Sequence, residues 1–203
     1  MSNIVDLHPD AEAELNNLAM SKAAQPLMDA VKRHIAENVE PITEQFFRLG
    51  EGRADRWSWA PGQLELLETA KDKAKASGLW NFFLPESEIG RGLTNLDYAY
   101  IAVELGKSPL ASESLNCSAP DTGNMEVLER VGTPEQKERW LKPLLNGEIR
   151  SCYAMTEPGV ASSDAKNIAT RAELVGDEWV INGEKYYISG AGDPRCKIMI
   201  CMV

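Results

Sequence analysis

The feature that most constrains the fold of this chain is a change in the spacing of its apolar residues near Arg150. Before this point, apolar residues recur at steps of three or four, which is the period of an amphipathic helix. The clearest such stripe comprises Leu27, Val31, Ile35, Val39, Ile42, Phe46 and Leu49. After this point the pattern changes to a period of two, which is typical of strands. We therefore predict an α+β fold, with an N-terminal all-α helical domain over residues 1–150 and a β domain over residues 151–203.

Proline and glycine divide the helical half into segments. Pro41 lies inside the stripe and should kink or divide that helix. Pro61 is expected to open the next helix, with Gly78 as its C-terminal cap. Asn95 is a candidate N-cap for a third helix that ends at Gly106.

The clearest helix start is Thr133-Pro134-Glu135-Gln136, which combines an N-cap threonine, a proline at the first helical position and a glutamine for a capping box. This helix should run to about Leu145 and stop at Gly147. Residues 79–85 form a dense apolar connector earlier in the chain, and we expect them to be buried.

Turn residues separate the expected strands of the second half. Gly176-Asp177 lies between the strand-like runs 170–175 and 178–181, and Asn182-Gly183 predicts a hairpin turn into a further strand. Residues 197–203 form a last apolar run and predict another strand. We expect an antiparallel, barrel-like sheet that is incomplete. Because an apolar terminal strand leaves an open sheet edge, we also expect the 203 residues to be part of a longer chain.

Composition limits the partners and the compartment. Lys plus Arg number 21 against 31 Asp plus Glu, and the net charge of -10 argues against general binding to nucleic acid. No run approaches the ~18 apolar residues of a membrane span, and the first residues lack the pattern of a secretory signal. The four cysteines show no C-x-x-C spacing, so we expect free thiols, and with 2 histidines we expect no metal site. A soluble, cytoplasmic protein is the expectation.

Two stretches of the second half carry candidate binding chemistry. Residues 151–164 read as a strand that breaks at Pro158 into a turn rich in hydroxyls, and residues 181–190 read as a turn followed by an aromatic strand ending in Ser189 and Gly190. Hydroxyl and backbone N–H donors beside an aromatic wall suit a planar ligand with polar edges, and a flavin is such a ligand.

A plainer interpretation of these residues stays open. Serine and aspartate side chains in such a turn can simply satisfy local backbone groups. Glu157 then reads as a solvated turn residue. In a strand Tyr186 and Tyr187 would point to opposite faces, so only one of them could line a given pocket.

The order of these motifs resembles the acyl-CoA dehydrogenase family. The segments that carry the resemblance are Tyr153–Pro158 with Ser163-Asp164, Asn182–Ser189 and Val131–Leu144. Segments 79–85 and 116–126 are similar to a subfamily that in animals is fused behind a kinase-like domain and favours longer acyl chains. The match runs through nearly the whole chain from about Leu27 onward.

The resemblance implies a set of flavin-contacting residues: Tyr153, Met155, Thr156, Ser162, Ser163, Tyr187, Ile188 and Ser189. Thr156 would supply a hydroxyl to the pyrimidine end of the ring, Ser163 would also contact acyl-CoA, and Ser189 would lie near flavin N5. The stretch from Tyr187 to Ser189 would be the second flavin strand. The turn after Pro158 has one residue more than is usual in the family, so the choice between Ser162 and Ser163 stays open. The family usually has tryptophan at the position of Tyr187.

The implied reaction is α,β-dehydrogenation of a medium- to long-chain acyl-CoA, with FAD as hydride acceptor and an electron-transfer flavoprotein as partner. The family's catalytic base is a glutamate in a C-terminal helical bundle, so we expect it beyond Val203; Glu157 belongs to the flavin-side turn. We expect the 203 residues alone to be inactive. A homodimer or homotetramer is implied, and the mitochondrial matrix and the peroxisome are alternative locations.

Two other function classes remain open. One is a related flavin oxidase that passes electrons to oxygen, and the other is a non-catalytic module that binds acyl-CoA or a protein. Weaker candidates are Arg91 and Lys107, which either meet a CoA phosphate or are surface charges. Either the loop from Asp121 to Glu126 borders the acyl pocket, or Asp121 caps the following helix. His8 and His34 have no spaced ligand partners.

Overall fold

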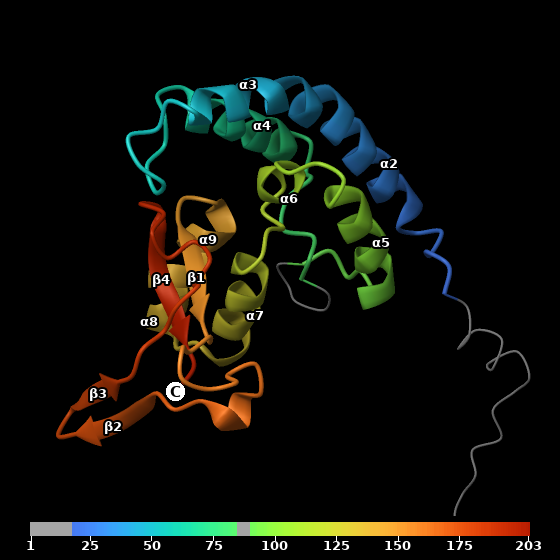
Figure 1. Cartoon of the computed structure of the whole chain (residues 1–203). Helices are drawn as coiled ribbons and strands as arrows, with labels where there is room; N and C mark the ends of the chain where they lie inside the picture. The colour runs from blue at the N-terminus through green and yellow to red at the C-terminus, as the bar shows by residue number, and fades with distance from the viewer. Residues whose placement is uncertain (1–17, 85–89) are drawn as a thin grey trace, which may run out of the picture.

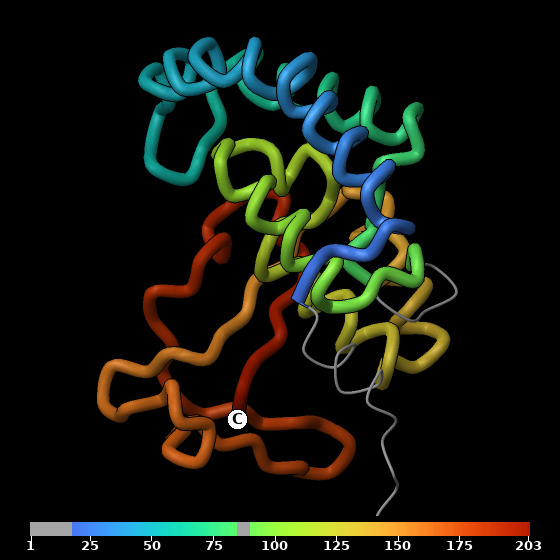
Figure 2. Tube along the Cα trace, turned by 90° about the vertical axis from the view of Figure 1, so that its right-hand side faces the viewer, coloured from blue at the N-terminus to red at the C-terminus, as the bar shows by residue number. Residues whose placement is uncertain are grey.

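A computed structural model describes residues 18–84 and 90–203 and places an arc of helices over a small sheet region (Figure 1). The helices of the upper arc are α2 (Gln25–His34), α3 (Glu40–Gly50), α4 (Gln63–Ala76), α5 (Asn95–Leu105) and α6 (Ala111–Ser114). Beside the strands lie α7 (Asp121–Val131), α8 (Pro134–Gln136) and α9 (Lys142–Asn146). Figure 2 shows the chain after a turn of 90°, with α3 at the top and the orange-red segment 171–182 at the bottom.

Two helices continue across a proline by means of one wider turn. Residues Ile35–Val39 form a π-helical segment between α2 and α3, just before Pro41, and Lys137–Leu141 form another between α8 and α9, just before Pro143. Proline has no N–H to offer the carbonyl four residues earlier, and its ring clashes with that carbonyl. The i→i+5 bonds of a π segment relieve this conflict. Pro41 therefore does not end the first helix: α2 and α3 are joined by a π-helical turn.

The helix ends follow the capping residues, with two corrections. The second helix begins at Gln63 rather than Pro61, because Gly62 has a φ of 82° and still belongs to the preceding turn. The third helix is capped by Thr94 rather than Asn95, since the Thr94 hydroxyl accepts the N–H of Asp97.

The helix predicted from residue 133 is confirmed in full. Thr133 and Gln136 form the reciprocal capping box. The helix ends at Gly147, which has a φ of 71° that suits glycine.

The core lies among the helices and takes in the apolar connector predicted to be buried. Phe82 is fully buried at 0% exposure, and Leu79, Phe83 and Leu84 are buried with it. Pro85 lies outside the described residues. Ile198 of the last strand packs against this core, so the helical arc and the sheet share apolar contacts.

The sheet region consists of two separate pairs of strands. Strand β1 (Arg150–Ala154) pairs with β4 (Cys196–Cys201), and β2 (Arg171–Val175) pairs with β3 (Glu178–Asn182). The order of a helical part followed by strands is confirmed. The antiparallel pairing is correct for β2 and β3, which turn at Gly176, but wrong for β1 and β4, which run parallel. The described residues form no closed barrel.

The predicted hairpin at Asn182-Gly183 is wrong. After β3, residues 183–186 form no strand and do not pair back onto β3. Gly183 instead lies against Thr170, where a Cβ on the glycine would stand 2.2 Å from the threonine Oγ1. The glycine is required here for close packing rather than for a turn.

A partly buried cluster of ion pairs joins the helical arc to the sheet. The Glu113 carboxylate of α6 lies 3.2 Å from Lys71 Nζ, 3.0 Å from Arg150 Nη1 and 2.6 Å from Arg195 Nη1. These cations come from α4, from β1 and from the segment before β4. The three neighbouring cations hold the pKa of Glu113 below its usual range despite burial, which alone would raise it.

Asp121 belongs to the same junction rather than to a cap. Its carboxylate makes no side-chain cap on α7. It lies 2.6 Å from Arg150 Nε and accepts the backbone N–H of Ser151 at 2.8 Å. The capping alternative is therefore wrong, and Asp121 ties α7 to β1.

None of the described helices is long and apolar enough to cross a membrane. All four cysteines are free thiols, as expected, and Cys117 and Cys152 are buried.

Candidate functional site

The two stretches singled out in the sequence meet in the structure. The N–H of Tyr186 donates to the carbonyl of Thr156 at 3.1 Å. Lys185 Nζ donates to the carbonyl of Met155, also at 3.1 Å. Residues 155–157 and 185–186 therefore run beside each other below the β1–β4 pair, although they are far apart in the sequence.

Glu157 is the centre of this contact rather than a solvated turn residue. Its side chain is 4% exposed and lies 2.8 Å from Lys185 Nζ. It also accepts the backbone N–H groups of Ala169 at 2.8 Å and Thr170 at 2.9 Å. The bonds from Lys185 and from the Thr170 hydroxyl lower the pKa of Glu157 to about 2. An ionised carboxylate so well supplied with donors anchors the turn, which agrees with excluding it as a catalytic base.

The two candidate serines differ in what their hydroxyls do. Ser162 is buried, and its Oγ accepts the backbone N–H of Glu157 at 2.8 Å. Ser163 is exposed, as is Thr156. Within the described residues the hydroxyls of Ser163 and Thr156 make no hydrogen bond, so both are open to a ligand, whereas Ser162 serves the turn.

The second stretch lines a groove of 870 Å³. Its walls include Arg56, Trp57, Tyr186, Tyr187, Ser189 and Met199. Ile188 also lines the groove and is half-buried.

Both tyrosines line this groove, against the expectation that only one of them could. Their ring centroids lie 4.4 Å apart with 35° between the planes. The stretch from Tyr187 to Ser189 is not a strand, and Tyr187 has a φ of 53°, which interrupts the alternation of sides. The Tyr187 side chain is 85% exposed and forms an open aromatic surface.

The first stretch does not line this groove. Tyr153 lies on β1 and is exposed, and Met155 is half-buried. The turn after Glu157 borders a separate hollow of 240 Å³, lined by residues that include Pro158, Thr170 and Gly183. The structure therefore brings the backbones of the two stretches together but assigns their side chains to two neighbouring surfaces.

Arg56 and Trp57 are groove residues that sequence reasoning missed. They lie in the loop between α3 and α4, far from the β half in sequence. The only local signal was the density of tryptophan and arginine in Arg53–Trp59, between two helical patterns.

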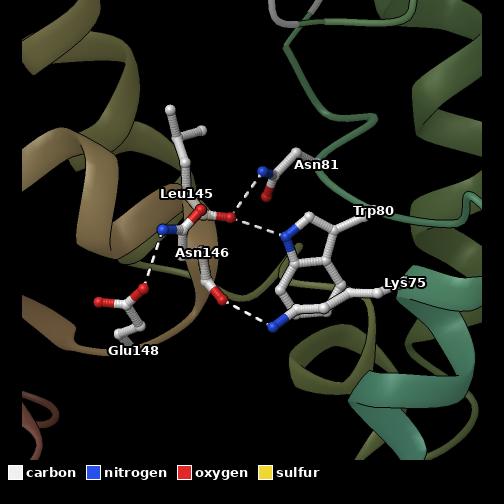
Figure 3. Close-up of a pocket in the computed structure, with 6 residues that line it drawn as sticks. All are labelled: Lys75, Trp80, Asn81, Leu145, Asn146 and Glu148. Atoms are coloured by element: carbon white, nitrogen blue, oxygen red, sulfur yellow. Dashed lines mark hydrogen bonds between the residues drawn. The ribbon is translucent and has the colours of Figure 1, made fainter.

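A second hollow, of 540 Å³, lies where α4, the apolar connector and the end of α9 meet (Figure 3). Its polar groups are occupied. Trp80 Nε1 and Asn81 Nδ2 donate to the Leu145 carbonyl at 2.7 and 2.8 Å, and Lys75 Nζ donates to the Asn146 carbonyl at 2.8 Å (Figure 3). These bonds satisfy the last carbonyls of α9, which have no partner inside the helix. We assign this hollow a structural role.

The remaining polar candidates make local contacts. His34 is buried and lies 3.2 Å from the Ser114 hydroxyl, and burial lowers its pKa. Lys107 forms an ion pair with Glu104. Arg91 bonds to the Gly78 carbonyl, and His8 lies outside the described residues. Over residues 18–84 and 90–203, no group of His, Cys, Asp and Glu is arranged to hold a metal ion.

Comparison with known families gives two matches that together cover most of the chain. Residues 21–148 match the N-terminal domain of acyl-CoA dehydrogenases, and residues 152–203 match the middle domain of the same enzymes.

Curated relatives agree with these matches. The chain is 47% identical over 210 residues to acyl-CoA dehydrogenase family member 10 of Mus musculus, across 99% of this chain and 19% of that protein. It is 48% identical over 186 residues to family member 11 of Gallus gallus, across 90% of this chain and 23% of that protein. The chain thus spans about a fifth of the length of these relatives.

Solved structures share the fold. An acyl-CoA dehydrogenase homologue from Mycobacterium abscessus superposes with a TM-score of 0.78 at 47% identity, over 89% of this chain and 46% of that one. A glutaryl-CoA dehydrogenase from Mycobacterium smegmatis, solved in complex with FADH2, gives a TM-score of 0.59 at 23% identity, over 88% of this chain and 42% of that one.

Proposed function

This chain belongs to the acyl-CoA dehydrogenase family, and from that premise we propose that it forms the flavin side of a site that dehydrogenates an acyl-CoA thioester. The observation that carries this proposal is the contact between residues 155–157 and 185–186, which places an open aromatic surface beside a hydroxyl-bearing turn. FAD, when bound, accepts the hydride from the substrate.

The residues of this chain would bind and orient the ring system. Tyr187 offers an exposed aromatic face against which a planar ring can stack. Thr156 and Ser163 present hydroxyls that can donate to polar ring edges without adding a formal charge. Ser189 adds a hydroxyl along the groove. Glu157 and Lys185 would support the site indirectly, because their ion pair holds the turn that carries Thr156 and Ser163.

The remaining parts of the proposal follow from the family. We propose that the substrate is a medium- to long-chain acyl-CoA, that electrons pass to an electron-transfer flavoprotein, and that the protein works as a homodimer or homotetramer in the cytoplasm, the mitochondrial matrix or a peroxisome. The proton-abstracting glutamate is proposed to lie outside these 203 residues.

The test uses the full-length protein. We expect a yellow preparation whose flavin absorbance is bleached by octanoyl-CoA or palmitoyl-CoA in the absence of oxygen. Bleaching that reverses rapidly with oxygen alone would favour an oxidase. A colourless protein that cannot be reconstituted with FAD would contradict the proposal and favour a binding module.

A variant sharpens the assignment of the groove. Tyr187→Ala removes the exposed ring and should weaken FAD binding about tenfold, because stacking and apolar contact are lost. Trp179→Ala, which removes another exposed ring from β3 away from the groove, is the matched control and should leave FAD affinity unchanged. Equal affinity in the wild type and Tyr187→Ala would show that the flavin lies elsewhere.

A further inference from the structure

The loop between α3 and α4 is ordered by its own side chains. The carboxylate of Asp55 accepts the backbone N–H groups of Trp57 at 2.7 Å and Ser58 at 2.8 Å. Arg53 Nε donates to the Gly50 carbonyl at 2.8 Å. An aspartate that caps its own turn in this way fixes the backbone that carries Arg56 and Trp57.

The same loop is docked onto the segment that forms part of the groove. In Figure 1 it descends from the helical arc toward the start of β4. The Trp57 ring lies so close to Gly192 that a Cβ on the glycine would stand 2.2 Å from it. Trp59 Nε1 lies 3.3 Å from Asp193 Oδ1, and the Arg195 guanidinium stacks 4.6 Å from the Trp59 ring centroid. The helical half therefore supplies a fixed wall to a groove otherwise formed by the β half.

The charges along this groove have one sign. Arg56 and Lys185 are its charged lining residues, and no carboxylate lines it. Lys185 is already paired with Glu157. Arg56 lies 4.8 Å from the centroid of the Trp57 ring and has no carboxylate partner within the part of the chain that the structure describes. In a chain of net charge -10, this leaves an uncommitted guanidinium at an aromatic groove.

We propose that Arg56 and Trp57 form an anion-binding end of the groove that holds a phosphate group of a nucleotide ligand. A guanidinium presents a planar fork of donors that matches phosphate oxygens. Stacking on the indole already restricts the orientation of the guanidinium, so it loses less conformational entropy when it binds a phosphate. The inference rests on the proposed function, because FAD and acyl-CoA both carry an adenosine diphosphate unit. Either one can supply the phosphate.

The experiment separates the two sources with phosphate-free analogues. For full-length protein stripped of flavin, titration calorimetry compares FAD with riboflavin. For the flavin-loaded protein, it compares octanoyl-CoA with octanoyl-pantetheine. The variants are Arg56→Gln, which removes the charge, and Arg56→Lys, which keeps the charge but loses the fork. Arg139→Gln is the matched control, because Arg139 stacks 4.6 Å from the ring centroid of its neighbour Trp140 but does not line the groove.

We expect Arg56→Gln to weaken binding of one phosphate-bearing ligand about tenfold while its phosphate-free analogue changes less than twofold. The ligand that is affected identifies the source of the phosphate. Arg56→Lys should fall between the wild type and Arg56→Gln, and Arg139→Gln should match the wild type.

Three results would overturn the inference. They are unchanged affinity for both phosphate-bearing ligands in Arg56→Gln, an equal loss for the phosphate-free analogue, and an equal loss in Arg139→Gln. If the wild type binds neither FAD nor octanoyl-CoA, the proposed function fails, and titration with ADP then decides the inference alone. Weaker ADP binding by Arg56→Gln supports an anion site, and equal or absent ADP binding refutes it.

Discussion

The helical arc and the β2–β3 hairpin place their apolar side chains in opposite surroundings. In the arc, residues such as Phe82 and Ile101 are fully buried among neighbouring helices. In the hairpin, Leu174, Trp179 and Ile181 are all more than half exposed, and both faces of the ribbon are open. The arc is held by apolar packing, whereas the sheet region next to the hairpin is held by a carboxylate and its donors. The difference indicates that apolar burial stabilises the helical arc, whereas polar contacts at Glu157 hold the region beside the hairpin.

The largest expected effect comes from truncating one aromatic residue in each region and comparing the losses of unfolding free energy. Phe82→Ala should cost about 3–5 kcal/mol of unfolding free energy, because it leaves a cavity among packed helices. Trp179→Ala should cost less than about 1 kcal/mol, because the ring is 66% exposed. Urea unfolding of the two variants measures both values. Similar losses would show that the hairpin is packed as tightly as the core.

A second test uses two glycines of the sheet region. Gly183→Ala should cost about 1–3 kcal/mol, because its Cβ would meet the Thr170 side chain at 2.2–2.7 Å. Gly159→Ala is the matched control, since nothing lies within 4 Å of the added Cβ. Thermal unfolding of both variants checks the prediction. A harmless Gly183→Ala would mean that segment 183–186 does not lie against Thr170.

The smallest expected effect concerns pH and the anchor of the sheet region. The pKa of Glu157 is lowered in the folded chain from 4.5 to about 2. Its stabilising contribution is therefore fully present above about pH 4.5 and is lost as the pH falls toward 2. The urea midpoints of the wild type and Glu157→Gln should differ at pH 6 and converge as the pH falls through this window. A difference that stays constant with pH would show that Glu157 acts through shape rather than charge.

Local signals predicted the helical half well. The capping box at Thr133, the glycine stop at Gly147 and the buried connector all depend on residues close in sequence. The misplaced helix starts at Pro61 and Asn95 were wrong by one or two positions, because a neighbouring glycine or threonine fitted the cap better.

The sheet region was predicted less well because its pairings are not local. Parallel pairing of β1 and β4 joins segments separated by the whole hairpin, and no short motif reports that separation. Asn182-Gly183 has the composition of a turn, yet the contact with Thr170 determines its conformation. The burial of Glu157 depends on Lys185 and Thr170, which lie well downstream, so the local turn composition pointed to solvent instead.

In the candidate site, too, some residues could be selected from the sequence and others only from the tertiary structure. The resemblance selected Tyr187, Ile188 and Ser189, and the structure places all three on one groove. Arg56 and Trp57 reach that groove from a loop of the helical half, a placement that only the tertiary structure reveals.

The ion-pair junction around Glu113 has a consequence for the order in which the chain can assemble. During synthesis, Lys71 and Glu113 emerge before Arg150, and Arg195 emerges last of the four. Until then the carboxylate has fewer cations beside it, and burying it costs more free energy. We expect the helices around Glu113 to pack only loosely while the chain is on the ribosome. They should pack tightly once the segment before β4, which carries Arg195, has been synthesised.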